Sequence, residues 1–139
     1  MILNNYNFIL FLFLVITIMH IPNAFSQEDK NQVTISNGAY SPLCAKTSTC
    51  YVPSNLIIES GEIVEWVNGD YAPHTITSGN IWAGKDHLFE SEILNHLEKF
   101  EFTFSGFEPG TYSYYCIIHP WMTGIISIDV YEIPFWKEI

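Results

Sequence analysis

The chain has 139 residues, which is enough for one domain with its own core. It carries 15 acidic side chains, five lysines and no arginine, and the whole net charge of −10 lies after residue 26. This balance argues against nucleic-acid binding, because phosphate recognition depends on clusters of lysine and arginine. The high content of isoleucine, phenylalanine and tyrosine argues against disorder, and the absence of a second long apolar run from the sequence excludes a protein with several membrane spans.

The first 26 residues form an uncharged apolar leader. An almost wholly apolar run covers residues 8–19, and residues 24–26 (Ala-Phe-Ser) have the small-x-small pattern of a cleavage site. This layout predicts a secretory signal peptide over residues 1–26 and a single exported domain over residues 27–139. No lysine or arginine precedes the run, so an uncleaved membrane anchor is the alternative, although a span needs roughly 20 apolar residues. In either case we expect the domain in the periplasmic or extracellular space, with membrane contact only through an uncleaved leader.

Downstream of the leader, the sequence has the pattern of short strands separated by turns such as Asn68-Gly69. Residues 100–104 alternate phenylalanine with polar residues, as expected of a strand with one buried face. Only residues 89–100 are compatible with a helix. Several short strands with turns between them predict an all-β antiparallel sandwich or barrel. We expect the strands at residues 33–36, 56–58, 62–67, 74–77, 100–104, 111–118 and 124–131.

The chain has three cysteines, an odd number. Cys44 and Cys50 flank a polar loop, and in an exported chain they are expected to pair with each other, with two free thiols as the alternative. A disulfide that closes so small a loop stabilises a fold by about 2 kcal/mol in the chain-entropy model. Cys116 is then left without a cysteine partner.

Cys116 begins a cluster of metal-binding residue types, Cys116-Ile-Ile-His119-Pro-Trp-Met122. Thiolate, imidazole and thioether form a soft donor set that suits copper, because sulfur ligands stabilise Cu(I) while imidazole accepts both oxidation states. His74, which comes shortly after the turn at residues 68–69, is the candidate for a further donor. Two histidines and one cysteine in a plane, with a long axial methionine, are the ligands of a blue-copper electron-transfer site. The alternative is that Cys116 and Met122 are ordinary core residues.

These segments resemble the cupredoxin family of blue copper proteins, closest in loop style to amicyanin and pseudoazurin and similar also to plastocyanin. Residues 110–124 (GTYSYYCIIHPWMTG) resemble the family's last strand, ligand loop and exit glycine, and residues 64–75 (VEWVNGDYAPHT) resemble its first-histidine region. The resemblance covers roughly residues 33–130, and the cysteine loop is similar to that of exported plastocyanin-like proteins of archaea. It implies a cupredoxin-like Greek-key β-sandwich or barrel of about seven to eight strands.

The same resemblance implies one bound copper ion that cycles between Cu(I) and Cu(II). Its expected ligands are His74, Cys116 and His119, which would bind strongly, and Met122, which would bind weakly. Two further residues, Asn68 and Thr75, are expected around these ligands. Thr75 stands where the family often has asparagine, so the hydrogen bonding toward the cysteine sulfur is expected to differ.

We therefore expect an exported mononuclear blue copper protein that carries electrons and is not an enzyme. It would work as a monomer with redox protein partners such as membrane-bound oxidoreductases. The alternative function is copper handling outside the cytoplasm without a dedicated redox partner. Residues 132–139 are expected to form a short C-terminal tail.

Two surfaces are candidates for electron exchange. Pro120 and Trp121 are expected to form an apolar docking patch beside an exposed edge of His119, unless Trp121 simply packs on the core. The side chain of Tyr115 is expected to point to the opposite face of the strand from Cys116, because side chains alternate along a strand. It offers a second surface for electron exchange, and the alternative is an ordinary strand tyrosine.

Overall fold

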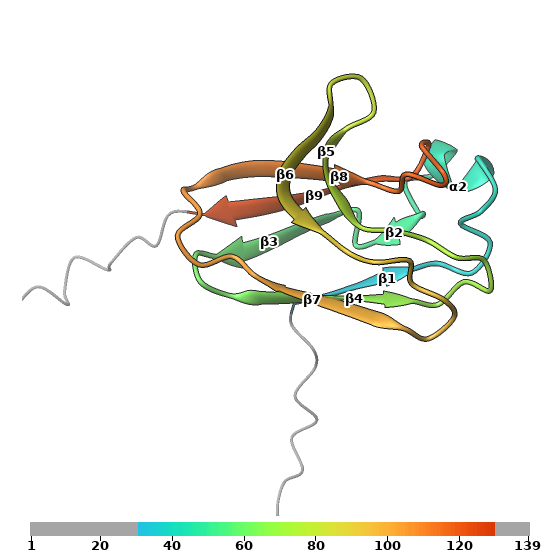
Figure 1. Cartoon of the computed structure of the whole chain (residues 1–139), viewed down its shortest axis with the longest axis horizontal. Helices are drawn as coiled ribbons and strands as arrows, with labels where there is room; N and C mark the ends of the chain where they lie inside the picture. Colours follow the sequence, from blue (N-terminus) through green and yellow to red (C-terminus); the bar gives the residue numbers. More distant parts are fainter. Residues whose placement is uncertain (1–30, 130–139) are drawn as a thin grey trace, which may run out of the picture.

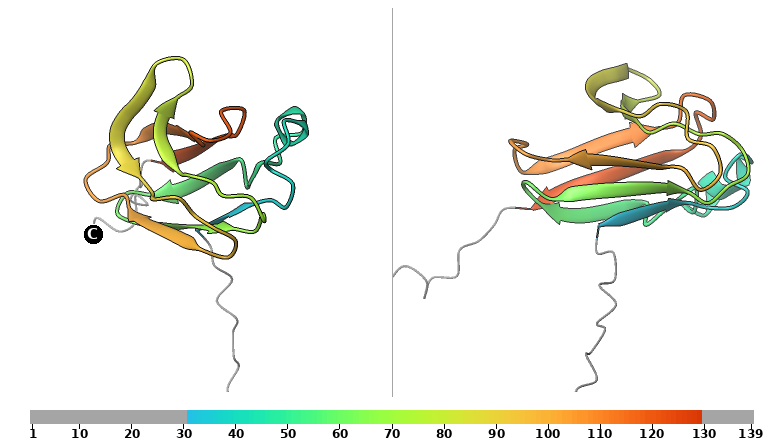
Figure 2. Two further views of the ribbon diagram at one scale, coloured as in Figure 1. Left: turned by 45° about the vertical axis from the view of Figure 1, so that its right-hand side comes forward. Right: turned by 60° about the horizontal axis from the view of Figure 1, so that its bottom comes forward.

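The computed structural model describes residues 31–129, which form two β-sheets packed face to face (Figures 1 and 2). The predicted signal peptide and the predicted tail at residues 132–139 lie outside the described residues. Within residues 31–129, none of the helical structure is long and apolar enough to cross a membrane.

The first sheet has four strands in the order β2-β1-β4-β7. These strands are β1 (Gln32–Ile35), β2 (Tyr51–Val52), β4 (Ile63–Asn68) and β7 (Lys99–Thr103). β1 runs parallel to β4, while the other two pairs are antiparallel. The short helix α2 (Leu43–Lys46) lies in the connection between β1 and β2.

The second sheet has five strands in the order β3-β9-β8-β5-β6. These strands are β3 (Asn55–Glu59), β5 (Thr77–Asn80), β6 (Gly84–Glu90), β8 (Gly110–Tyr115) and β9 (Thr123–Asp129). β3 runs parallel to β9, and the remaining pairs are antiparallel. The hairpin of β5 and β6 projects from the body of the sandwich (Figure 1).

The predicted all-β sandwich is confirmed, with three differences in detail. The sheets do not close into a barrel, and two strand pairs are parallel because chain segments cross between the sheets before they pair. Nine strands appear in the described residues instead of seven or eight, since β2 has only two residues and the largely exposed β6 lacks an alternating apolar pattern. Residues 89–100, the one stretch compatible with a helix, contain the end of β6 and the start of β7.

Aromatic side chains from both sheets form the centre of the core. The ring of Trp66 in β4 is fully buried, and its centroid lies 5.6–6.4 Å from the rings of Phe89, Phe100, Phe104 and Tyr114. Most of these rings are tilted or edge-on, which are the favoured arrangements for aromatic pairs. Because Trp66 belongs to the first sheet and Tyr114 to the second, this cluster holds the two sheets at a defined separation.

Three segments meet at one end of the sandwich. β4 ends at Asn68 and β8 ends at Tyr115, and the residues that follow each strand leave the sheets at the end where α2 also lies (Figure 1). There the predicted disulfide between Cys44 and Cys50 is confirmed. The fold therefore brings together the segments that contain His74 and Cys116.

Gly124 in β9 tests how closely the strands pack. A Cβ atom at this position would clash with Cζ of Tyr114, whose side chain is enclosed by the core. We expect Gly124→Ala to lower the free energy of unfolding by about 1 to 3 kcal/mol through overpacking. Urea denaturation of the metal-free protein measures this change. The neighbouring exposed position provides the control, since Thr123→Ala should change stability by less than about 0.5 kcal/mol; equal stability of the two variants would contradict the close contact.

Candidate metal centre

Cys116 and His119 lie in a tight loop between β8 and β9. The backbone N–H of Cys116 donates to the carbonyl oxygen of Met122 at 3.2 Å, and the N–H of Met122 donates to the carbonyl oxygen of His119 at 2.9 Å. These two hydrogen bonds close the loop on itself. The side chains of the Cys-x-x-His-x-x-Met motif are therefore held in a fixed relation to β8.

His74 reaches the same end of the sandwich from the segment that follows β4. Its backbone exchanges two hydrogen bonds with Leu94, at 3.1 and 2.8 Å, and this isolated bridge stands where the sequence predicted the start of a strand. The strand itself, β5, begins only at Thr77. The side chain of His74 is fully buried, and its ring nitrogen Nε2 contacts Asp70.

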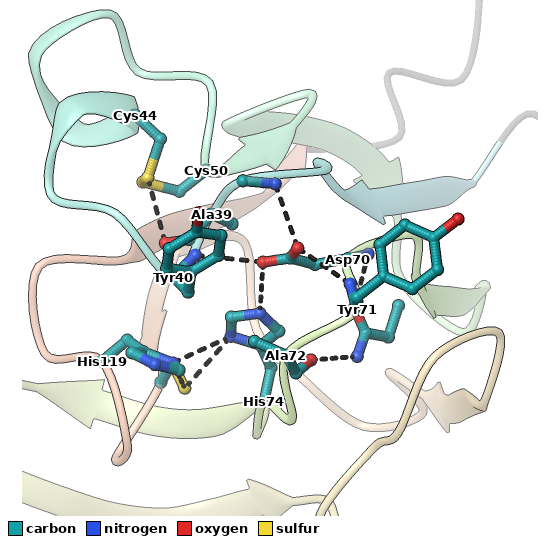
Figure 3. Close-up of polar contacts among 12 residues, drawn as sticks. Ala39, Tyr40, Cys44, Cys50, Asp70, Tyr71, Ala72, His74 and His119 are labelled. Atoms are coloured by element: carbon teal, nitrogen blue, oxygen red, sulfur yellow. Dashed lines mark hydrogen bonds and ion pairs between the residues drawn. A yellow bond between two sulfur atoms is a disulfide. The ribbon is translucent and has the colours of Figure 1, made fainter.

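The three candidate strong ligands converge (Figure 3). Nδ1 of His74 lies 3.1 Å from Nδ1 of His119, and Sγ of Cys116 lies 3.8 Å from the first nitrogen and 3.9 Å from the second. A metal bound at about 2.0 Å by nitrogen and about 2.3 Å by sulfur in a trigonal plane would separate such donors by about 3.5 to 3.7 Å. The donor spacing and the N₂S donor type thus fit a copper ion, and this is the one such group found in residues 31–129.

Met122 is fully buried and ends the same loop. The sequence assigned it as the weak axial ligand. Its backbone bonds to Cys116 and His119 tie it to the loop that carries two of the three converging donors.

Thr75 contributes to the surroundings of the sulfur, as the sequence predicted. Its backbone N–H donates to Sγ of Cys116 at 3.3 Å, and its hydroxyl accepts the N–H of Ile117 at 3.0 Å. Burial raises the pKa of the Cys116 thiol, but the contact with His74 and the surrounding backbone N–H groups outweigh burial and lower that pKa overall. The site therefore favours the thiolate, which is the form that binds a metal.

Within residues 31–129, the side-chain hydrogen bonds of Asn68 are with neighbouring backbone groups and not with the donor atoms themselves. Its side-chain amide donates to the carbonyl oxygens of Ala72 and Leu94, both at 2.9 Å, and its side-chain oxygen accepts the N–H of Asp70. These contacts shape the segment that leads to His74.

Asp70 is the residue that sequence reasoning missed. Its carboxylate is fully buried and accepts the Nε2–H of His74 at 3.0 Å (Figure 3). Burial raises the pKa of Asp70, but hydrogen bonds from the N–H of Gly38 and from His74 outweigh it, so the pKa is lowered overall. A carboxylate on the outer nitrogen of a metal-ligating histidine fixes its tautomer and its ring orientation. The only signal in the sequence is the spacing of four residues between an acidic side chain and His74.

The predicted docking residues differ in exposure. His119 is partly exposed and Pro120 is exposed, as expected. Trp121 is half-buried, since its indole N–H donates to the carbonyl oxygen of Ala39 at 3.2 Å and its ring lies 5.2 Å from that of His119. Trp121 therefore packs against the body of the protein while part of its side chain stays exposed, and its role in docking stays a prediction.

The side chain of Tyr115 is only 9% exposed. It lies in β8 between β5 and β9, and the expectation that its ring forms an accessible surface is wrong. Sequence alternation placed it on the face opposite Cys116 but could not show that this face is covered. The exposed apolar side chains next to His119 in the chain are instead Ile117 and Ile118.

Comparison with known proteins agrees with this geometry. The model of the cupredoxin-like domain family matches residues 8–128. The chain belongs to this family. The cupredoxin is 33% identical to amicyanin from Paracoccus versutus over 79 residues, 57% of this chain and 58% of that protein. It is 31% identical over 81 residues to a plastocyanin from Synechococcus, 53% of this chain and 58% of that protein. The chain thus covers less than two thirds of the curated relatives it matches.

Two solved structures are similar to this cupredoxin. A purple cupredoxin from Nitrosopumilus maritimus is 38% identical, with a TM-score of 0.62, over 70% of this chain and 98% of that chain. A copper-containing nitrite reductase from Thermus scotoductus is 26% identical, with a TM-score of 0.51, over 71% of this chain but only 22% of that chain. The second similarity is therefore to one part of a larger enzyme.

The hydroxyl of Thr75 provides a test of the frame around the sulfur. Thr75→Val keeps the backbone donor to Cys116 but leaves the N–H of Ile117 without its acceptor. We expect a loss of about 1 to 2 kcal/mol in the free energy of unfolding of the metal-free protein, measured by urea denaturation. Thr75→Ser should retain most of that stability, and Thr103→Val at an exposed site of β7 is the matched control. If the two valine variants were equally stable, the hydroxyl would have no structural role.

Proposed function

We propose that this cupredoxin is an exported electron carrier with one type 1 copper ion. His74, Cys116 and His119 would bind the ion strongly and Met122 would bind it weakly. The observation that carries the proposal is the convergence of two imidazole nitrogens and one thiol sulfur within 3.9 Å of one another. Copper supplies the one-electron exchange between Cu(I) and Cu(II), and the protein supplies the rest of the mechanism.

The chain's contribution is a frame that resists rearrangement. Backbone hydrogen bonds on both sides of His74 and across the 116–122 loop hold the donors without help from a metal. The N–H of Thr75 points at the sulfur and stabilises negative charge on it. Because charge changes at the site while its atoms stay in place, little energy is lost to reorganisation during electron transfer.

Electrons would enter and leave at the exposed edge of His119. Pro120 and the exposed apolar residues around it, Ile117 and Ile118, offer a surface that excludes water when a partner docks. The net charge of −10 would steer a partner with a basic surface over longer distances, so association should depend on ionic strength. Redox proteins, including membrane-bound oxidoreductases, are the proposed partners.

Export and the monomeric state belong to the same proposal. The Cys44–Cys50 disulfide is typical of the periplasmic or extracellular space, where thiols are oxidised. An electron carrier is favoured over copper delivery because Cys116 and Met122 are both buried, whereas a delivery site needs accessible sulfur ligands. It is also favoured over an enzyme, since the proposed ligands fill the site and leave no open position for a substrate.

Copper loading tests the ligand set directly. We expect the oxidised copper protein to show an intense visible absorption band from charge transfer between the Cys116 thiolate and Cu(II). Cys116→Ser should abolish the band, whereas His87→Asn, at an exposed histidine of β6 outside the cluster, should leave it unchanged. A wild-type protein that binds Cu(II) without colour would refute the proposed function.

The docking surface can be tested without knowing the partner, because two copies of the carrier exchange electrons with each other. Ile118→Asp places a charge beside His119, and we expect it to slow electron self-exchange at least tenfold by desolvation and repulsion. NMR line broadening in mixtures of Cu(I) and Cu(II) protein measures the rate. Ile57→Asp, on exposed β3, adds the same charge elsewhere and is the matched control. Equal rates for the two variants would place electron exchange at another surface.

A further inference from the structure

We propose that the segment of residues 38–40, against which the Cys44–Cys50 disulfide lies, positions both histidine donors of the site, and that Asp70 is the positioning residue through which the segment acts on His74. The role of the two histidines as copper ligands rests on the proposed function, whereas the contacts described below do not depend on it. The same three residues contact Asp70, the partner of His74 (Figure 3), and Trp121, which packs against His119.

The contact toward His74 runs through the buried carboxylate. Oδ1 of Asp70 accepts the N–H groups of Gly38 at 3.0 Å and Tyr71 at 2.8 Å. Oδ2 accepts the N–H of Tyr40 and the Nε2–H of His74, both at 3.0 Å. Two of the four donors therefore come from residues 38–40. A buried carboxylate needs hydrogen-bond donors. Moving this segment would therefore either shift the Asp70 carboxylate, which orients His74, or leave it without two of its donors.

The contact toward His119 runs through Trp121. The indole N–H of Trp121 donates to the carbonyl oxygen of Ala39 at 3.2 Å, and the indole ring packs 5.2 Å from the imidazole of His119 at 56°. Ala39 itself is fully buried. Residues 38–40 thus support one histidine by an electrostatic contact and the other by packing.

The disulfide holds this segment in place because packing does not hold the loop that follows it. Helix α2 has no buried residue, and residues 45–49 are all exposed. The sulfur of Cys44 lies 3.5 Å from the carbonyl oxygen of Ala39, and the N–H of Ser36 donates to the carbonyl oxygen of Cys50 at 3.0 Å. The bridge therefore holds one end of the exposed loop against Ala39, inside the segment, and the other end against Ser36, just before it.

Asp70→Asn is the sharpest single change at this site. The asparagine keeps the size of the side chain, but one of its two terminal groups is an NH₂ that faces two N–H donors instead of accepting from them. The double variant Cys44→Ser/Cys50→Ser opens the loop and leaves every contact of Asp70 chemically possible. Asp86→Asn, at an exposed aspartate in β6, is the matched control.

The first readout uses the metal-free protein and does not depend on copper. In the wild type, we expect the Nε2 proton of His74 to be protected from solvent exchange by its buried bond to Asp70, as measured by NMR. Exchange should become at least tenfold faster in the double serine variant and in Asp70→Asn. It should stay unchanged in Asp86→Asn.

The second readout uses the copper protein. Removing the outer partner of a metal-ligating histidine typically weakens metal binding by about 10- to 100-fold, and we expect a loss of this size in each of the two variants together with a shifted visible band. If the loop acts through Asp70, combining the variants should add little to the larger single effect on the band. Trp121→Phe, which keeps a ring but removes the donor to Ala39, tests the His119 side and serves if the double serine variant does not fold.

Unchanged proton exchange and an unchanged band in the double serine variant would overturn the inference, as would an unchanged band in Trp121→Phe where that variant stands in. Fully additive effects of opening the loop and of Asp70→Asn would also overturn it, because they would show that the loop does not act through Asp70. Failure of the proposed function is a separate result: the wild-type protein would then lack the visible band, while the proton-exchange readout would still decide whether the loop positions His74.

Discussion

Donor atoms carried by loops from two different sheets must meet within 4 Å, and the rest of the structure depends on this constraint. His74 follows a strand of the first sheet and Cys116 follows a strand of the second, 42 positions later, yet their donor atoms lie 3.8 Å apart. The separation of the sheets is set by the aromatic cluster around Trp66, which packs against Tyr114 from the opposite sheet. Packing of the core therefore also sets the spacing of the donor atoms, because a close-packed interior transmits small shifts of one sheet to the other.

Polar groups buried at this end of the sandwich complete the frame. His74, Thr75, Asn68 and Asp70 are all buried, and each has hydrogen-bond partners within the protein. Burying such groups is costly unless they are paired, and a fully paired network is rigid. In the proposed role this rigidity is useful twice, since it holds the donors before a metal arrives and limits their movement when the charge on the metal changes.

Membership of the cupredoxin family accounts for the fold, while the function depends on particular side chains. A similar domain forms part of a nitrite reductase, so the architecture alone does not separate a carrier from an enzyme. The proposed carrier role rests instead on the combination of an N₂S donor set, a partly exposed His119 and the exposed apolar side chains of Ile117 and Ile118 on a strongly acidic protein. The negative charge attracts a partner over about a Debye length, whereas Ile117 and Ile118 act only once the two surfaces touch. The two features therefore serve successive stages of the proposed association, first approach and then docking.

The sequence by itself determined what depends on neighbouring residues. Alternation predicted β4 and β7, the short polar loop predicted the disulfide, and the spacing of Cys116, His119 and Met122 predicted a soft metal site, because all of these are local patterns. Only the tertiary structure decided the parallel pairing of β1 with β4, the burial of Tyr115 and the four donors around Asp70. Each of these depends on contacts between segments far apart in the chain, or on what covers a strand face, and no local periodicity contains that information.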